Sequence, residues 1–401
     1  MQKEDRRRRI WTTVLSCLLI LQTSTLVAAA VSQGPIKEQS VRSIAPGITY
    51  KEYSEAMENT RVIFRVVEVD LSNPNIKVKP IYGNNGQIGS KAKVTTMVSQ
   101  SGAVAAINSS FFRTDNEGGT LGTIIKDGKI LSNPAKVPGW KTLAFTKGGQ
   151  AVIGSFGFRG QIKAPNGKTF PLEGLNKTEY FAPGSLASNY SDNIHLFTRD
   201  WSPISRGSLE GYEDILEVEV KDNMVTDIRT SLGPKPIPQN GYVLFANGSA
   251  SQFLKNNFKR GDKVEVSYQM TPGQLEIMQA IGVNYSLVEK GVPVLTFPSD
   301  SDLTGKHSRS AIGIDRSGTR MYLVSVDRSN RNPGVTLPEL ANILINLGAY
   351  HGVNLDGGSS TSLVVRQPGN LQLTRVNDGS VDEEHPVADA LGIFYLAPQG
   401  P

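Results

Sequence analysis

The stretch Val-Asn-Leu-Asp-Gly-Gly-Ser-Ser-Thr at residues 353–361 is the most informative part of the sequence, because it predicts a buried strand that ends in a polar, glycine-rich loop. A short apolar run ends there in the carboxylate of Asp356, and two glycines and three hydroxyl side chains follow. Glycines let the backbone approach a ligand closely and can aim amide N–H groups at an anion. The pattern favours a functional loop, although Asp-Gly-Gly is also ordinary turn chemistry and a purely structural loop is the alternative.

The residues before this stretch predict a helix that leads into the strand. Thr336 and Glu339 have the spacing of a capping box, in which each side chain bonds to the other residue's backbone N–H. Leu340 and Leu344 then recur at helical spacing, and Gly348 supplies a stop. A helix followed by a buried strand therefore delivers Asp356 onto a glycine-rich loop.

Strand-like segments dominate the rest of the chain. Residues 62–69 are rich in β-branched side chains, residues 103–107 form an apolar run that ends at Asn108, and residues 120–300 hold many short β-type runs between Gly and Pro. We therefore predict an α+β fold of mixed, strand-dominated sheets with a few helices in one large domain over 61–399. An interior insertion between about 150 and 275 is compatible with this organisation.

The two apolar strands share a pattern. Gly102 precedes Asn108 by six residues, and Gly348 precedes Asn354 by the same offset. Both segments are predicted to run from a helix through a glycine stop and an apolar strand to a polar loop. Although chance explains so few identities easily, a duplicated half-site would place both loops at one cleft.

The beginning of the chain has the pattern of an export signal. Arg6–Arg9 precede an apolar run that reaches about Val27, and Ala28–Ala30 offer a small-residue cleavage site. We predict a signal peptide over 1–30, followed by a linker and lead-in segment over 31–60. An uncleaved anchor is the alternative, because the apolar run is near the lower length limit for a membrane span. It would be the only contact with a membrane.

Composition limits the partners and the compartment. Cys17 is the only cysteine and lies inside the predicted signal, so the exported protein has no disulfide and no thiolate chemistry. This favours a bacterial cell-envelope protein, periplasmic or extracellular. The formal net charge is +5, much of it from the signal segment, and no later basic run is interleaved with aromatic residues. A nucleic-acid partner is therefore not expected.

Five motifs follow one another along the chain, namely AINSSFF at Ala106–Phe112, HSRSAIG at His307–Gly313, VTLPELA at Val335–Ala341, NLDGGSST at Asn354–Thr361 and HPVADAL at His385–Leu391. In this order they resemble the phosphodiester glycosidase family, and the resemblance spans about 48–396. The family's best-known activity removes N-acetylglucosamine from its phosphodiester to mannose, and bacterial members are often linked to exopolysaccharide genes. The resemblance implies an exported hydrolase that cleaves a sugar 1-phosphodiester in an envelope or extracellular polysaccharide.

This chain departs from the family pattern at several positions. The family usually has a glycine pair where this chain has Ser109 and Ser110, and it favours a third glycine where Ser359 stands. Its last motif commonly carries an arginine and an asparagine where this chain has His385 and Asp389. The glycine that the family tends to place after its Asp is also missing from Val-Asp-Arg at residues 326–328. These changes bear on substrate choice and rate.

The chemistry of a sugar 1-phosphodiester suggests roles for the motif residues. A phosphate ester is a weak base and can leave without a strong general acid, so one carboxylate with cationic and amide donors could suffice. We predict Asp356 as nucleophile or general base, and Arg309 as the group that grips the phosphate bidentately. Asn108 is the third predicted catalytic residue, holding a sugar hydroxyl or the phosphate.

Further residues of the same motifs are predicted to bind substrate. Asp389 is also the best candidate for a second carboxylate, ahead of Asp327, and His307 could carry a proton. A structural alternative is that Arg309 pairs with Asp315 or Asp327. The predicted substrate-binding set is Gly357, Gly358, Ser360, Thr361, His307 and Asp389.

No metal or cofactor is predicted. The chain has four histidines, no His-x-x-His spacing and no calcium-loop pattern, although scattered Asp and Asn residues leave a divalent site open. Two other functions compete with the hydrolase. One is a glycan or sugar-phosphate binding protein that kept the pocket without catalysis, and the other is a metal-dependent phosphodiesterase that cleaves the P–O bond.

Overall fold

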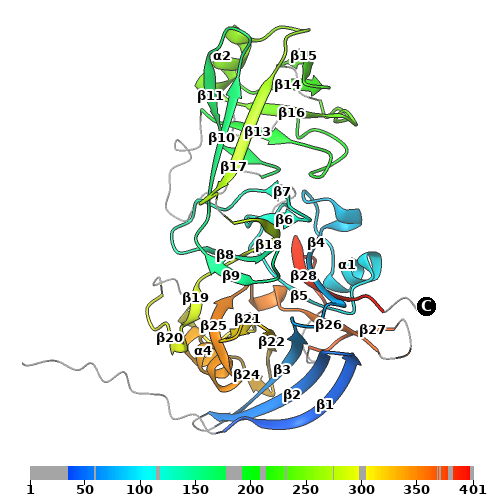
Figure 1. The fold of residues 1–401 in the computed structure, drawn as a ribbon, viewed down its shortest axis with the longest axis vertical. Coiled ribbons are helices and arrows are strands. Elements are labelled where there is room, and N and C mark those ends of the chain that lie inside the picture. Colours follow the sequence, from blue (N-terminus) through cyan, green and yellow to red (C-terminus); the bar gives the residue numbers. More distant parts are fainter. Residues whose placement is uncertain are drawn as a thin grey trace, which may run out of the picture. The chain divides into compact units, whose positions relative to one another are not determined.

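The computed structural model describes most of the chain after the predicted signal peptide (Figure 1). The signal peptide expected over 1–30 lies outside the described residues. No helix within the described segments has both the length and the apolar character needed to span a membrane. The described residues are 35–57, 60–113, 118–177, 192–207, 214–230, 233–273, 275–297, 304–367, 369, 372–377 and 383–397.

The largest sheet has eight antiparallel strands and carries one helix on one face. Strands β3, β22, β21 and β25 form its centre, and α4 packs against apolar residues of this sheet such as Phe64 and Val324. In order across the sheet the strands are β1 (Lys37–Ala45), β2 (Ile48–Met57), β3 (Thr60–Asp70), β22 (Arg320–Val326), β21 (Arg309–Asp315), β25 (Ala349–Asn354), β19 (Ser286–Glu289) and β20 (Val292–Pro293), with α4 at Leu337–Asn346.

Two five-stranded sheets share a core with the other face of the large sheet. Ile312 of the large sheet, Ile107 of the second and Ile281 of the third are fully buried in one apolar cluster. The second sheet is β27 (Leu373–Arg375), β26 (Leu363–Arg366), β5 (Ala105–Asn108), β28 (Asp389–Tyr395) and β4 (Ile76–Tyr82), contacted by α1 (Val94–Ser101). The third is β7 (Lys129–Ser132), β6 (Ile124–Lys126), β18 (Ile277–Val283), β8 (Lys141–Thr146) and β9 (Ala151–Gly154).

Residues 157–271 form an insertion with its own apolar core, in which Ile194, Val218 and Leu244 are fully buried. Its three-stranded sheet is β11 (Thr169–Leu172), β10 (Gly157–Lys163) and β17 (Glu265–Thr271). Its five-stranded sheet is β12 (Gly174–Leu175), β13 (Ile194–Phe197), β16 (Gly241–Ala246), β14 (Leu216–Lys221) and β15 (Met224–Arg229), with helix α2 at Gly248–Asn257. Elsewhere lie the small pair β23 (Arg328–Ser329) and β24 (Asn332–Pro333) and the short helices η1 (Asn84–Gly86) and η3 (Gly358–Ser360).

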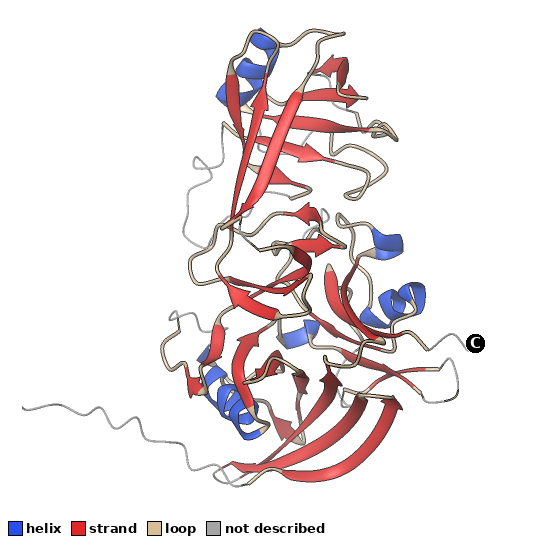
Figure 2. Ribbon diagram, in the orientation of Figure 1, coloured by secondary structure: helices blue, strands red, loops and turns tan. Residues whose placement is uncertain are grey.

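The strand-dominated prediction is confirmed, and the balance is closer to mostly β than to α+β (Figure 2). The predicted capping box is present at the start of α4. The Thr336 hydroxyl accepts from the Glu339 amide at 3.3 Å, and the Thr336 amide donates to the Glu339 carboxylate at 2.7 Å.

The segment over 31–60 is predicted from the sequence to be a linker and lead-in, but the structure places strands there. Most of it, residues 37–57, forms β1 and β2 of the large sheet. Strand β1 is largely exposed and lies at the sheet edge, so its sequence shows no apolar alternation. A polar edge strand carries little periodic signal because packing does not demand one.

Two glycines let the third sheet approach the polar loop that follows β5. A Cβ on Gly282 would lie 2.3 Å from the Cα of Gly122, and a Cβ on Gly122 would lie 2.4 Å from the Ser110 hydroxyl. Ser110 in turn donates its hydroxyl to the Gly282 carbonyl at 3.1 Å. The close approach of the backbone at Gly122 and Gly282 therefore fixes the position of the loop at 109–110.

We expect Gly282→Ala to lower the free energy of unfolding by about 1–3 kcal/mol, because backbone atoms would have to move apart. Chemical denaturation followed by circular dichroism measures this change. Gly233→Ala is the matched control, since a Cβ there meets nothing within 4 Å. Equal stability of the two variants would show that the close backbone approach at Gly282 does not require a glycine.

Candidate active site

The predicted catalytic residues Asp356 and Arg309 come from neighbouring strands, since Asp356 follows β25 and Arg309 begins β21, which pairs with β25 (Figure 1). The Leu355 amide donates to the Ser310 carbonyl at 2.9 Å, and the Gly358 amide donates to the Ser308 carbonyl at 2.8 Å. Pairing with β21 thus continues past the strand and sets Asp356 and Gly357 beside Arg309. A Cβ on Gly357 would lie 2.8 Å from the Ser308 carbonyl oxygen, so glycine permits this close approach to the segment that carries Arg309.

The Arg309 guanidinium is buried and anchored by backbone carbonyls. Its Nε donates to the Val335 carbonyl at 3.3 Å and its Nη2 to the Gly305 carbonyl at 2.8 Å. Of the alternative partners, Asp315 lies at the other end of β21 and accepts from the Thr319 and Arg320 amides in the hairpin turn. Its carboxylate therefore belongs to the turn.

Asn108 connects three elements from a fully buried position. Its Nδ2 donates to the Asp356 carbonyl at 2.7 Å, and its Oδ1 accepts from the Ser310 hydroxyl at 2.7 Å and the Ser362 amide at 3.0 Å. The Asp356 amide donates to the Ser109 carbonyl at 2.9 Å. Both ends of the Asn108 side-chain amide therefore bond within the protein, and the direct catalytic contact expected from the sequence stays a prediction. The loops after β5 and β25, which follow the two similar sequence segments, therefore contact each other.

Asp389 lies at the start of β28 and is fully buried. Its Oδ1 accepts from the Ser109 hydroxyl at 2.5 Å and from the Ser110 amide at 2.7 Å. Its buried Oδ2 has no hydrogen-bond partner among the residues that the structure describes. A buried carboxylate oxygen without a donor is costly, and such groups are typical of functional sites.

The electrostatic environment makes Asp356 a proton-exchanging group near neutral pH. Burial, with a smaller contribution from the negative charge of Asp389, raises the pKa of Asp356 to about 7, and hydrogen bonds from Ser360 and the Gly357 amide oppose the rise. The Gly357 amide donates to the Asp356 Oδ1 at 2.9 Å. The exposed residues Gly358 and Ser359 follow directly, so the loop that carries Asp356 is open to solvent.

Lys177 is a candidate that sequence reasoning missed. Its ammonium group is buried and donates to the carbonyls of Leu121 at 2.6 Å and Gly122 at 3.0 Å. Burial lowers the pKa of Lys177 to about 7, and the negative charge of Asp389 opposes this shift. A single lysine after a short strand carries no spacing signal, so only the folded structure reveals its burial.

The other predicted residues lie in different surroundings. Thr361 is buried with its hydroxyl lacking a hydrogen-bond partner, and His307 is partly buried, with its backbone paired to Val335. Asp327 accepts from Arg65 at 2.7 Å and from the Asn377 amide nitrogen at 2.7 Å, so a structural network holds this carboxylate. Asp389 is thus the better second carboxylate.

Within the part of the chain that the structure describes, no three His, Cys, Asp or Glu side chains lie together as a metal site.

Part of the sequence is similar to a known protein family, and the fold is similar to those of solved structures. Residues 214–394 match the phosphodiester glycosidase family model, which confirms the predicted resemblance over that stretch. This stretch contains Arg309, Asp356 and Asp389, whereas Asn108 and Lys177 precede it.

Two solved structures share the fold. A hypothetical protein from Synechocystis is 25% identical with a TM-score of 0.72, and the match covers 90% of this chain and 64% of that one. A protein from Burkholderia pseudomallei that is described as exported is 19% identical with a TM-score of 0.71, covering 84% and 75%.

Curated relatives overlap with this chain over only a small part of their own length. Pyruvate carboxylase from Pichia angusta is 21% identical over 298 residues, which cover 73% of this chain and 22% of that protein. The chain thus spans less than a quarter of this relative.

The raised pKa of Asp356 predicts a pH dependence of stability. Because the folded pKa of about 7 exceeds the ordinary value of 3.8, folding becomes less favourable as the pH rises between these values. We expect Asp356→Asn to remove part of this loss, so that the variant gains stability relative to the unmodified protein between pH 4 and pH 8. Urea denaturation across that range measures the difference. A constant difference at every pH would show that Asp356 does not titrate in this way.

Proposed function

Because residues 214–394 carry the sequence pattern of the phosphodiester glycosidase family, we propose that this chain is an exported hydrolase of sugar 1-phosphodiesters in an envelope or extracellular polysaccharide. The family match supports an enzyme that hydrolyses glycosyl phosphodiesters. Export is proposed from the basic and apolar segment before Ala30. The fold is also shared with a protein from Burkholderia pseudomallei that is described as exported.

One arrangement carries the proposal, namely two carboxyl groups that interact electrostatically, with the loop of one of them beside Arg309. Asp356 and Asp389 interact closely enough for one to raise the pKa of the other, and Arg309 lies beside the Asp356 loop. Paired carboxyl groups are what glycoside hydrolysis uses. The guanidinium is the group that best matches a phosphate.

The proposed reaction breaks the bond between the anomeric carbon and the phosphate oxygen. The ionised Asp356 either attacks the anomeric carbon or removes a proton from the attacking water, and the phosphate departs with the electron pair of the broken bond. Arg309 and the amide groups of Gly357 and Gly358 stabilise the charge on the departing phosphate. Ser360 and Thr361 supply hydroxyl groups at the same loop.

Asp389 and Lys177 complete the proposed site behind this loop. Asp389 stabilises the positive charge that develops on the sugar ring, and its negative charge adds to the effect of burial, which is the main cause of the raised pKa of Asp356. The ammonium group of Lys177 interacts electrostatically with Asp389. Asn108 acts through Asp356, because its amide holds the backbone of that residue.

A glycan-binding protein without catalysis is the second candidate. The serines at 109–110 and the acid at 389 replace the usual family residues at the site, which favours altered function. A metal-dependent phosphodiesterase is the third candidate. The hydrolase breaks the C–O bond, the phosphodiesterase breaks the P–O bond and the binding protein breaks neither, so isotope labelling separates them.

Hydrolysis of a nitrophenyl sugar phosphodiester in ¹⁸O-water tests the proposal. We expect the label in the sugar, because the C–O bond breaks. Label in the phosphate would support P–O cleavage, and binding without product release would support the glycan-binding protein. Asp356→Asn should lower turnover by about 100-fold or more, since it removes a catalytic base. Asp262→Asn in the insertion is the control, and unchanged turnover in a folded Asp356→Asn variant would remove that residue from the mechanism.

Asp389→Asn tests the coupling of the two carboxyl groups. An asparagine oxygen can still accept from Ser109 and Ser110, so the loop should be retained. Because the negative charge at 389 raises the pKa of Asp356, its loss should move the acid limb of the kcat/KM profile to lower pH. Glu384→Gln is the control, since Glu384 bonds to Thr95 and Ser362 instead. A profile that does not move would show that Asp389 leaves the Asp356 proton unaffected.

A further inference from the structure

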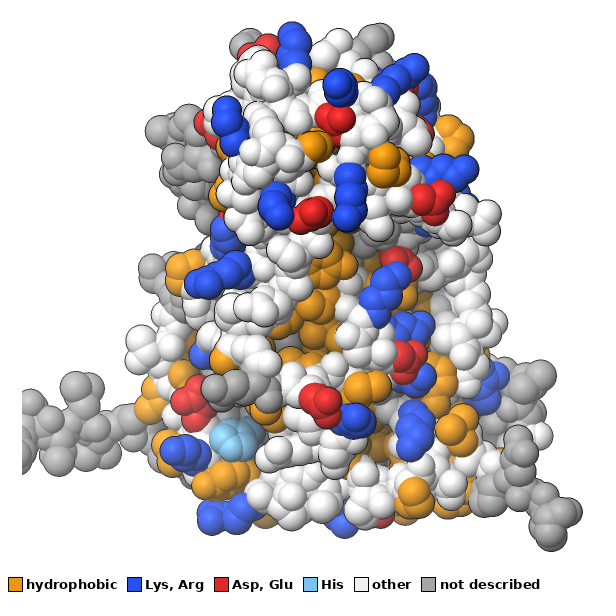
Figure 3. All heavy atoms as spheres, turned by 45° about the horizontal axis from the view of Figure 1, so that its top comes forward, with side chains coloured by type: hydrophobic (Ala, Val, Ile, Leu, Met, Phe, Trp, Pro, Cys, Tyr) orange, Lys and Arg blue, Asp and Glu red, His pale blue; other side chains and the backbone are white. Residues whose placement is uncertain are grey.

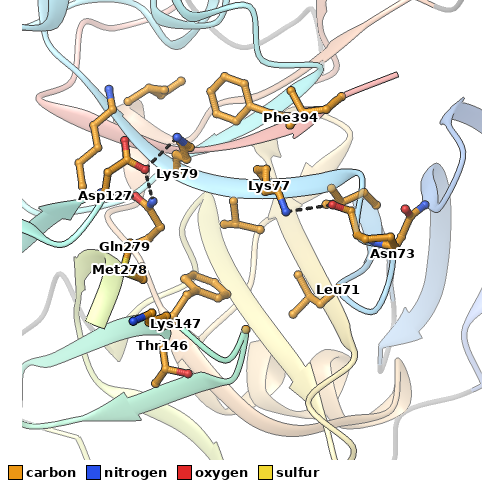
Figure 4. Close-up of a pocket in the computed structure, with 18 of the residues that line it drawn as sticks. Leu71, Asn73, Lys77, Lys79, Asp127, Thr146, Lys147, Met278, Gln279 and Phe394 are labelled. Atoms are coloured by element: carbon orange, nitrogen blue, oxygen red, sulfur yellow. Dashed lines mark hydrogen bonds and ion pairs between the residues drawn. The ribbon is translucent and has the colours of Figure 1, made fainter. Parts of the chain in front are cut away.

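A groove with a cavity volume of about 780 Å³ lies at the ends of β4, β18 and β28 (Figure 4). We name it the lysine groove. Apolar side chains from the ends of β4, β8 and β28, among them Ile81, Phe145 and Phe394, line its floor. Four lysines stand around this floor, namely Lys77, Lys79, Lys126 and Lys147.

The lysines leave the groove with an excess of positive charge. Lys79 pairs with Asp127 at 2.8 Å, and Lys147 lies 3.5 Å from Glu276. Lys77 donates to the Pro74 carbonyl at 2.9 Å, and the ammonium of Lys126 lies 5.1 Å from the centre of the Tyr82 ring. Asp127 is the only acidic residue among the described groove residues, so the groove attracts anions.

The lysines are placed for an extended ligand. Lys77 and Lys79 project from the same side of β4 because alternate residues of a strand share a face. Lys147 comes from the turn between β8 and β9, on another side of the floor (Figure 4). Hydrophobic side chains gather in a hollowed part of the molecular face in Figure 3, with Lys and Arg side chains beside them. An apolar floor with a cationic rim suits a sugar chain that bears negative charges.

The groove and the proposed active site share strands. Strand β28 carries Asp389 at its start and Phe394 in the groove, roughly 17 Å apart at about 3.4 Å per residue, and these two side chains stand on opposite faces of the strand. The groove contains side chains from both faces of β4, the edge strand of the same sheet, with Val78 on one face and Lys77 and Lys79 on the other. A polymer cleaved at Asp356 would reach the groove around this edge.

We propose that the lysine groove is a second binding site that holds a segment of an anionic polysaccharide while another segment of the same chain is cleaved at Asp356. The inference rests on the proposed function for the identity of the polymer. It gives the enzyme a preference for charged polymers over small phosphodiesters, since only a polymer reaches both sites.

Phosphorylated dextran, which has no glycosyl phosphodiester to cleave, is a suitable probe of the groove. The full chain and the double variant Lys77→Gln/Lys147→Gln are compared by titration at low salt. We expect the variant to bind phosphorylated dextran about tenfold more weakly, because two attractive charges are lost, and high salt to reduce the difference. Lys168→Gln/Lys259→Gln, at exposed positions of the insertion, is the matched control and should bind like the unmodified protein.

Three outcomes would overturn the groove proposal. The first is unchanged affinity of the groove variant for phosphorylated dextran. The second is an equal loss in the control variant, which would indicate general charge attraction. The third is a loss of binding to phosphatidylglycerol vesicles alone, which would make the groove a lipid site.

Turnover separates the groove from the active site. The groove variant should hydrolyse the small nitrophenyl substrate at the normal kcat and KM, and a parallel loss there would make the groove lysines structural and refute the inference. If the unmodified protein leaves the small substrate uncleaved, the proposed function fails, whereas the dextran titration still decides whether the groove binds a polyanion.

Discussion

The side-chain amide of Asn108 is the interaction on which the site depends. It joins the end of β5 to the Asp356 carbonyl, the Ser310 hydroxyl of β21 and the Ser362 amide before β26. The strands β5 and β26 belong to the second sheet, whereas β21 and β25 belong to the large sheet. The Asn108 amide therefore connects the two sheets at the ends of these strands. A buried amide that satisfies three partners fixes their geometry, because any displacement leaves a buried polar group unpaired.

Local chemistry made much of this architecture predictable. The capping box at 336–339 and the carboxylate after the apolar run at 353–355 depend on neighbouring residues, and the structure contains both. Lys177 was missed because its burial results from packing between segments distant in sequence. The edge strand β1 was missed because exposure removes the periodic pattern. The motifs identified Asn108, but only the hydrogen bonds show that it positions another residue.

The departures from the family pattern form a matched set. An acid at 389 in place of the usual asparagine introduces a buried negative charge, which needs donors. The serines at 109–110, where the family has a glycine pair, provide a hydroxyl and an amide to that acid. The substitutions therefore explain one another physically, and together they place a second carboxyl group near Asp356.

The insertion has an apolar core of its own, and a second apolar cluster joins its Phe197, Trp201 and Phe245 to Ile124 and Leu131 of the third sheet. The residues of its own core are thus freer to diverge than those at this junction. Lys177 also lies at the junction, since it belongs to the insertion and bonds to backbone carbonyls beside the site. A relative with a shorter or unrelated insertion would keep its carboxyl groups but lose a buried cation, and evolution could adjust the working pH of such enzymes by exchanging this single module.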